Sequence, residues 1–171
     1  GVKNALRAGI DSVEHGIYLD AEAIDLFLKT GAYLVPTLAA PHFILKGGLA
    51  AGIPAHAVEK TKRVAETHCR SVEMAHRAGV KIAAGSDAGT PLNPHADLVT
   101  ELELMVGVGF TPMETLTCAT RAAADLLGLS DVGTIEAEKR ADLIVLEQDP
   151  LSDISALRHV NLVFKEGKRV Q

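Results

Sequence analysis

Asp87 is the residue whose setting most suggests chemistry, because a short, mostly apolar segment at residues 81–86 leads directly into it. This segment predicts a buried strand that ends at the carboxylate. Counting back with the two-residue period of a strand, Gly85 and Ala83 share the face of Asp87, which leaves room beside the carboxylate for a metal ion and a substrate. Barrel enzymes place catalytic groups at the carboxyl ends of parallel strands. The alternative is that Asp87 caps the next segment, since Asp is also a common turn residue.

His15 is the second candidate, because it also follows an apolar strand pattern and precedes a glycine. Imidazole and carboxylate groups are ordinary ligands of Zn²⁺, so His15 and Asp87 form the pair most able to hold a metal ion. A catalytic zinc ion typically has about three protein ligands and a water molecule, so this pair alone is short of a complete site. A histidine that only makes structural hydrogen bonds is the alternative, and the residues leave it open.

Three segments would position these side chains, since each has the same order of helix, glycine, strand and polar or glycine end. They cover residues 6–15, 28–37 and 76–85. In each segment a basic residue lies in the last helical turn, and the glycine follows as a left-handed cap. Strands separated by helices predict parallel βα units. His15, Thr37 and Asp87 are therefore expected at the carboxyl ends of neighbouring strands, along one edge of the sheet.

The segments between these strands predict two helices and a lid. Asp20 can cap a helix that runs through Lys29. The apolar stripe of this helix consists of Ala23, Ile24, Phe27 and Leu28. A long helical pattern covers residues 54–78, whereas the apolar, glycine-containing residues 39–53 predict a loop that folds over the edge as a lid. Pro36 lacks an amide hydrogen, so we expect it at the very end of its strand.

The later part of the chain predicts two more helices and then antiparallel strands. An Asn-Pro pair begins a helix over residues 93–106, and a capping box with proline at the first helical position begins another over residues 111–127. Residues 141–146 predict a strand, and residues 161–170 predict a hairpin that turns at Glu166-Gly167. We therefore place a second, small β unit here, packed against the first.

Composition and charge limit the classes of protein. The 171 residues are 47% apolar and 23% charged, enough for a sizeable core in one domain or one and a half small ones. A net charge of −5, 4% aromatic residues and no Trp argue against a nucleic-acid partner. No apolar run approaches the roughly 20 residues of a membrane span. Cys69 and Cys118 are interpreted as two buried free thiols, since neither a disulfide framework nor a metal motif surrounds them.

A series of spaced motifs resembles the later half of metal-dependent hydrolases of the amidohydrolase superfamily, in the imidazolonepropionase-like and Xaa-Pro-dipeptidase-like subgroup. The motifs lie at residues 11–16, 33–37, 85–90, 93–95, 101–105, 111–114, 133–135 and 141–146. They span essentially the whole chain in the right order. The resemblance implies an α/β fold: residues 1–130 would be the C-terminal part of a (β/α)8 TIM-like barrel, strands 6–8 with their helices. Residues 131–171 would be the C-terminal strands of a small β-sandwich.

The resemblance also implies roles for individual residues. His15 matches a ligand of the second metal in two-metal members, and Asp87 matches the catalytic aspartate that binds the first metal and accepts a proton from water. His95 would hold a substrate carboxylate, and Thr37 is a further candidate substrate contact. The implied cofactor is a divalent metal, with zinc favoured and one or two ions in the full-length enzyme. Glu138 departs from the glycine that these enzymes usually place at its position.

The implied function is hydrolysis of C–N bonds, with a small amide, dipeptide or cyclic amide as substrate. The other ligands of this superfamily would lie upstream of Gly1, and the chain begins in the middle of a helical pattern. We therefore expect the C-terminal portion of such an enzyme, incomplete for catalysis on its own. A cytoplasmic location is favoured, although any signal would lie in the missing part.

Two rival interpretations belong to other classes. The first is a non-catalytic scaffold or degenerate partial barrel, which the residues encoded upstream of Gly1 would decide. The second is a phosphate-binding α/β domain, against which the absence of a glycine-rich phosphate loop counts. A barrel cut in this way would expose unpaired edge strands, so we also expect association into homo-oligomers in isolation.

Overall fold

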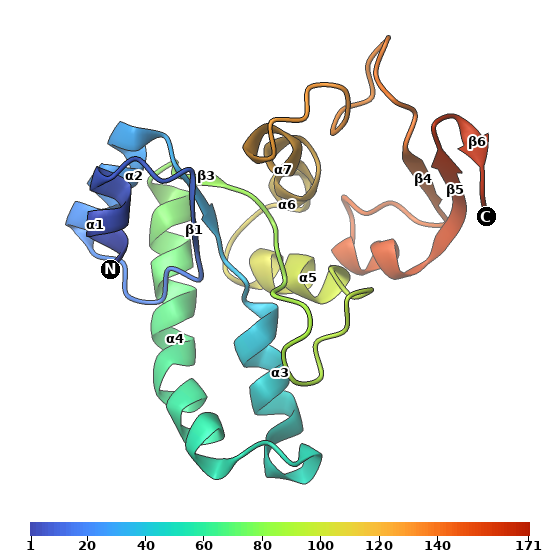
Figure 1. Ribbon diagram of the computed structural model, residues 1–171. Coiled ribbons are helices and arrows are strands. Elements are labelled where there is room, and N and C mark those ends of the chain that lie inside the picture. The colour runs from blue at the N-terminus through green and yellow to red at the C-terminus, as the bar shows by residue number, and fades with distance from the viewer.

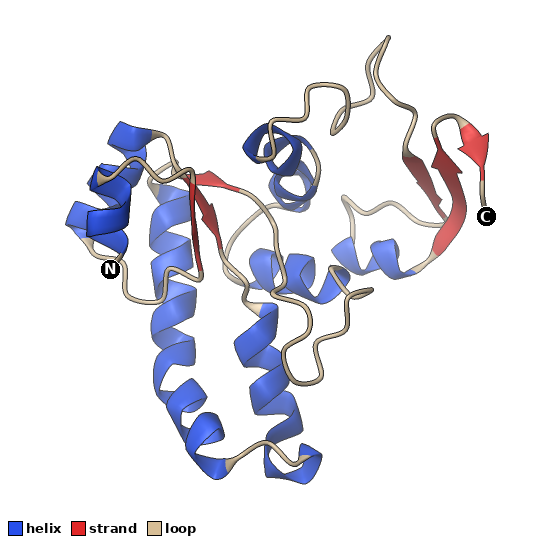
Figure 2. Cartoon of the chain, viewed as in Figure 1, coloured by secondary structure: helices blue, strands red, loops and turns tan.

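The computed structural model describes residues 1–171 and has the predicted mixed α/β character, with two separate three-stranded sheets (Figures 1 and 2). The first sheet is parallel, in the order β1 (Ser12–Glu14), β2 (Tyr33–Val35) and β3 (Lys81–Ile82). Val13 pairs with Leu34, which in turn pairs with Ile82. All three side chains are buried. The prediction of parallel βα units is therefore confirmed.

Three helices cover the buried face of this sheet: α1 (Val2–Arg7), α2 (Ala21–Thr30) and α4 (Ala55–Arg77). Their buried residues join the strands in one core that includes Leu6, Ala23, Ile24, Phe27, Leu34, Val72 and Ala75. The expected glycine caps are present, with left-handed φ angles of 85° at Gly9, 72° at Gly31 and 81° at Gly79. The apolar stripe predicted for α2 is wrong at Leu28, which is 49% exposed and lies outside the buried face.

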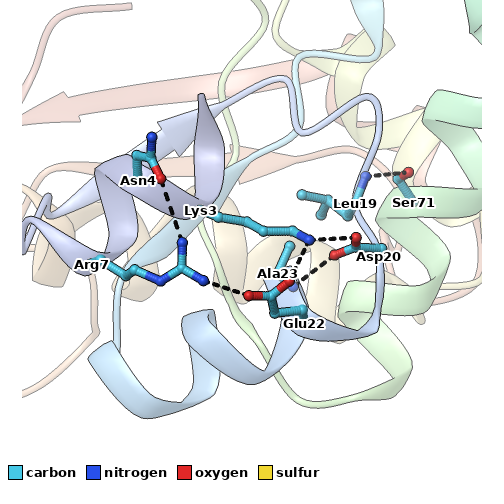
Figure 3. Close-up of polar contacts among 8 residues, drawn as sticks. All are labelled: Lys3, Asn4, Arg7, Leu19, Asp20, Glu22, Ala23 and Ser71. Atoms are coloured by element: carbon cyan, nitrogen blue, oxygen red, sulfur yellow. Dashed lines mark hydrogen bonds and ion pairs between the residues drawn. The ribbon is translucent and has the colours of Figure 1, made fainter.

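Ion pairs tie α1 to the start of α2 (Figure 3). Lys3 lies 2.7 Å from Asp20 and 2.6 Å from Glu22, and Arg7 also pairs with Glu22. Asp20 is the predicted cap, since its carboxylate accepts a hydrogen bond from the Ala23 amide at 2.9 Å. Because these charges are exposed, the pairs fix the orientation of α1 more than they add stability.

The predicted lid loop at residues 39–53 is wrong, because this segment is helical. It forms α3 (Ala39–Gly47) and the 3-10 helix η1 (Gly48–Ala51), and α3 lies alongside α4 as a helical hairpin (Figure 1). Phe43 and Ile53 are buried, as they would not be in an open loop. Pro36 lies directly after β2, as expected.

The next helices differ from their predicted bounds. The helix expected from residue 93 begins later, as α5 (Val99–Gly107), where the Asp97 carboxylate accepts from the Thr100 amide at 3.0 Å. The helix expected over residues 111–127 begins with its capping box but breaks at Thr120, giving α6 (Pro112–Ala119) and α7 (Arg121–Leu126).

The second sheet is antiparallel, in the order β4 (Leu143–Leu146), β5 (Val160–Lys165) and β6 (Lys168–Arg169). Its hairpin turns at Glu166-Gly167 as predicted, with φ angles of 51° and 76° that suit a type I′ turn. The 3-10 helix η2 (Ile154–Arg158) packs on α5, and Arg158 bonds both carboxylate oxygens of Glu103 at 2.9 and 2.7 Å. A domain boundary at residue 130 stays a prediction.

The two cysteines differ in environment. Cys118 is buried, and burial raises the pKa of its thiol to about 11. Cys69 is exposed, so the prediction of two buried thiols is wrong for this residue. No helix in the structure combines the length and the apolar character needed to cross a membrane.

Replacement of Glu138 by glycine should stabilise the protein. Glu138 has a φ angle of 71° in a turn closed by the Lys139 amide and the Glu136 carbonyl, 3.4 Å apart. A side chain in the left-handed region costs roughly 1–2 kcal/mol, whereas glycine adopts it freely. We expect Glu138→Gly to raise the free energy of unfolding in urea by about 1 kcal/mol. Glu138→Ala is the control: it removes the same carboxylate but keeps a Cβ, and an equal gain in both variants would contradict the backbone explanation.

Candidate functional site

The carboxyl ends of the three parallel strands carry unusual backbone angles. Only six non-glycine residues in the chain have positive φ angles, and three of them follow these strands: His15 at 69°, Thr37 at 56° and Asp87 at 53°. Because β1, β2 and β3 are parallel and adjacent, all three residues lie along one edge of the sheet. Non-glycine residues in this region cost about 1–3 kcal/mol each and concentrate at functional sites. The residues predicted from sequence therefore coincide with the strained positions of the sheet.

A hydrogen bond joins His15 to Thr37, with 2.6 Å between Nδ1 and Oγ1. The Thr37 hydroxyl has one proton, which it donates to the Pro36 carbonyl oxygen at 2.7 Å. From this contact we infer that the hydroxyl accepts from His15, whose Nδ1 then carries the hydrogen. The lone pair of the His15 ring is then on Nε2. This is the tautomer that a metal-binding histidine needs when its other nitrogen is held by a hydrogen bond.

His68, in α4, supports the same strand ends from the core. It is 2% exposed, and its Nε2 lies 2.8 Å from the His15 carbonyl oxygen and 2.9 Å from that of Pro36. Since both partners only accept, Nε2 carries the hydrogen and donates to both. Burial lowers the pKa of His68, so it remains neutral in this role. His68 is therefore a structural residue of the strand ends.

Asp87 lies in a turn that Asn93 holds from within. Asn93 is 2% exposed, and its Nδ2 donates to the carbonyl oxygens of Ser86 and Asp87 at 2.6 and 3.1 Å. Thr90 Oγ1 also donates to the Asp87 carbonyl at 3.1 Å. The backbone of Asp87 thus forms the turn, whereas its side chain is exposed. The Asp87 carboxylate accepts none of the hydrogen bonds that hold this turn, which counts against the capping alternative.

The space expected beside Asp87 is partly filled. A Cβ on Gly85 would lie 2.6 Å from Val35 Cγ1, so glycine here makes room for a neighbouring strand residue and not for a ligand. His95 lies close to the turn, because a Cβ on Gly89 would be 3.6 Å from its Nε2. His95 itself is exposed.

Glu101, in α5, is a buried carboxylate beside the strand ends. It is fully buried and accepts hydrogen bonds from the amides of Leu38 at 2.9 Å and Ala39 at 2.6 Å. Burial raises the pKa of Glu101 to about 7, against the effect of these donors. Sequence reasoning gave no role to Glu101, although an acidic residue between buried apolar positions of a helix is itself a signal.

A depression of about 580 Å³ lies beside His15, between α1 and the start of α2. Its lining includes Asn4 and Glu14 as well as the ion-paired Lys3 and Arg7 of Figure 3. No group of three or more His, Cys, Asp or Glu side chains is gathered closely enough in this chain to hold a metal ion.

Comparisons with known proteins agree with one another. The model described as "Amidohydrolase family" matches residues 1–170. Ochratoxinase from Aspergillus niger is 32% identical over 98% of this chain and 35% of its own length, and imidazolonepropionase from Cereibacter sphaeroides is 30% identical over 91% and 34%. A crystal structure of a Xaa-Pro dipeptidase with bound methionine in the active site has a TM-score of 0.89 and 36% identity over 99% of this chain and 42% of that one. The chain thus spans well under half the length of these relatives.

Removal of the Asn93 amide should loosen the Asp87 turn. Asn93→Ala leaves the Ser86 carbonyl oxygen without its side-chain donor and the Asp87 carbonyl oxygen with Thr90 alone, so we expect the free energy of unfolding to fall by about 1–2 kcal/mol. The Gly89 amide, which donates to the Asn93 carbonyl at 2.9 Å, should also exchange faster in hydrogen-exchange NMR. Asn161→Ala, at an exposed position of β5, is the control and should change stability by less than about 0.5 kcal/mol. Equal effects of the two variants would contradict the role given to Asn93.

Loss of the Thr37 hydroxyl should change the tautomer of His15. In Thr37→Val no protein group accepts the Nδ1 hydrogen, so the ring should shift toward the Nε2–H form that free imidazole side chains prefer. Nitrogen-15 NMR of the histidine rings in mildly alkaline buffer measures this directly. Thr37→Ser keeps the hydroxyl and should keep the Nδ1–H form. A valine variant with an unchanged His15 spectrum would disprove the assigned hydrogen bond.

Proposed function

The chain belongs to the amidohydrolase family, and we propose that it is the C-terminal portion of a metal-dependent hydrolase that breaks C–N bonds. The observation that carries this proposal is the edge of the parallel sheet, where His15, whose Nδ1 is hydrogen-bonded to Thr37, and Asp87, with an exposed carboxylate, occupy strained strand ends. Strain of this kind persists only where the surrounding structure holds it, and it is typical of catalytic and ligand sites.

Within this proposal, β1, β2 and β3 are strands 6–8 of a (β/α)8 barrel, and residues 1–130 form that part of the barrel. The parallel order of the strands and the helices that follow them support this assignment. The antiparallel sheet in residues 131–171 would belong to the small β-sandwich. The remaining barrel strands would come from outside this chain.

Members of the amidohydrolase family generally use divalent metal ions. The donor set fits such an ion: the His15 Nε2 is a neutral nitrogen lone pair, and Asp87 supplies anionic oxygen, both common for Zn²⁺. We propose these two as metal ligands, with zinc as the metal. A catalytic zinc ion takes about three protein ligands, so one or two ions in the complete enzyme would draw further ligands from outside this chain.

The chemistry then divides between the cofactor and this chain. A bound divalent metal ion would lower the pKa of a water molecule to about 7 and so supply a nucleophile at neutral pH. Asp87 would accept the proton of that water and deliver it to the leaving nitrogen. The hydrogen bond to Thr37 would orient the His15 ring toward the metal ion. The turn held by Asn93 would keep the Asp87 carboxylate at the edge of the sheet.

The proposed substrate is a small amide, dipeptide or cyclic amide. His95 is exposed next to the Asp87 turn, where an imidazole can hold the carboxylate of such a substrate. Thr37 is buried, and its hydroxyl is occupied by His15 and Pro36. We therefore propose that Thr37 acts on His15 and not as a direct contact to the substrate.

Substitution of Asp87 in the longer protein that carries this chain tests the proposal. We expect Asp87→Asn to reduce dipeptide hydrolysis by about 10²–10⁴-fold, because the amide cannot accept the proton. Asp11→Asn, at the opposite end of β1, is the matched control and should retain activity. The 171-residue chain alone should bind Zn²⁺ weakly and show no turnover. Equal activity of both variants, or robust hydrolysis by the chain alone, would contradict the proposal and favour the scaffold alternative.

A further inference from the structure

Helix α3 begins without a cap of its own. The residue before it is Leu38, which offers no side-chain hydrogen bond to the first helical amides. These amides have no partner within the helix and need one when they are buried. The carboxylate of Glu101, 62 and 63 residues along the chain, is that partner, with bonds of 2.6 Å to Ala39 and 2.9 Å to Leu38. A negative charge at a helix N-terminus is favoured as well by the helix dipole.

The same carboxylate holds the backbone next to the residue that contacts His15. Its two donors, the Leu38 and Ala39 amides, belong to the residues that directly follow Thr37. These bonds hold the chain immediately beyond Thr37, whose φ angle is 56°. The direction of the Thr37 hydroxyl follows from that backbone, and the hydroxyl determines which nitrogen of His15 carries the hydrogen.

We propose that Glu101 is a positioning residue that, through α3 and Thr37, holds His15 with Nε2 available to a metal ion. The inference rests on the proposed function for the identity of the ligand, but its structural part concerns the state of His15 alone. Glu101 contacts neither metal nor substrate in this role. Its effect on the ring is transmitted by two hydrogen-bonded steps, from Glu101 to the amides of Leu38 and Ala39 and from Thr37 to His15.

Nitrogen-15 NMR of the His15 ring in Glu101→Gln tests this positioning role. Glutamine presents an amide NH₂ group to one of the backbone donors, so at least one bond at the start of α3 is lost. We expect His15 to change from the Nδ1–H form to a mixture with the Nε2–H form. The spectrum is recorded in mildly alkaline buffer, because the pKa of Glu101 is about 7 and its carboxylate must be charged.

Glu103→Gln is the matched control, since it lies in the same helix but pairs with Arg158 at the surface. It should leave the His15 spectrum unchanged. A double variant, Glu101→Gln with Thr37→Val, should change the ring no further than Thr37→Val alone, because both act on one path. An unchanged His15 spectrum in Glu101→Gln would overturn the proposal.

A buried charge is difficult to replace, so the unmodified chain provides a second test. The amides of Leu38 and Ala39 should exchange as slowly as those inside α3 if Glu101 caps them, and fast exchange would overturn the proposal. In the longer protein, Glu101→Gln should also weaken Zn²⁺ binding by about 10–100-fold. A changed tautomer with unchanged Zn²⁺ affinity would support the positioning role and count against His15 as a ligand, which separates this inference from the proposed function.

Discussion

The edge of the parallel sheet depends on hydrogen bonds from buried polar side chains to strained backbone. Each of the three left-handed residues after the strands has such a support. They are His15, Thr37 and Asp87. His68 donates to the carbonyl of His15, Glu101 accepts from the two amides that directly follow Thr37, and Asn93 donates to the carbonyl of Asp87. Because each support is at most 2% exposed, water cannot replace it, and the strain is retained.

These supports link the edge of the sheet to the core. His68 lies on α4 four residues before Val72, and Glu101 lies on α5 four residues before Met105, so each pair shares a helix face. Val72 and Met105 are fully buried members of the central core. A shift of either helix would therefore move a hydrogen-bond partner of the strand ends. The orientation of the candidate ligands is thus a property of helix packing and not of the loops that carry them.

The sequence predicted best those features that depend on neighbouring residues. The glycine caps, the Thr111 capping box and the Glu166-Gly167 turn are all determined within a few residues, and all are present. The parallel strands pair over longer separations, but the helix, glycine and strand order that repeats in each segment predicted them. The sequence placed the start of α5 too early. Asn93 resembles a helix cap, but its side-chain amide donates to the Asp87 turn instead. The break at Thr120 carries no Gly or Pro signal. The helix ends there beside the residues that follow β3, because the Ala84 amide donates to the Cys118 carbonyl oxygen at 3.0 Å.

Helix α3 shows most clearly why the candidate site could be predicted only in part. Residues 39–53 resemble a loop because they contain glycines and lack a local cap, yet the cap exists and comes from Glu101 on another helix. A carboxylate is buried only where donors compensate its lost hydration, so Glu101 among the buried residues of α5 requires such donors somewhere. Short-range patterns identify which residues can bind a metal or transfer a proton. The residues that orient them are recognisable as charges placed where burial would otherwise forbid them.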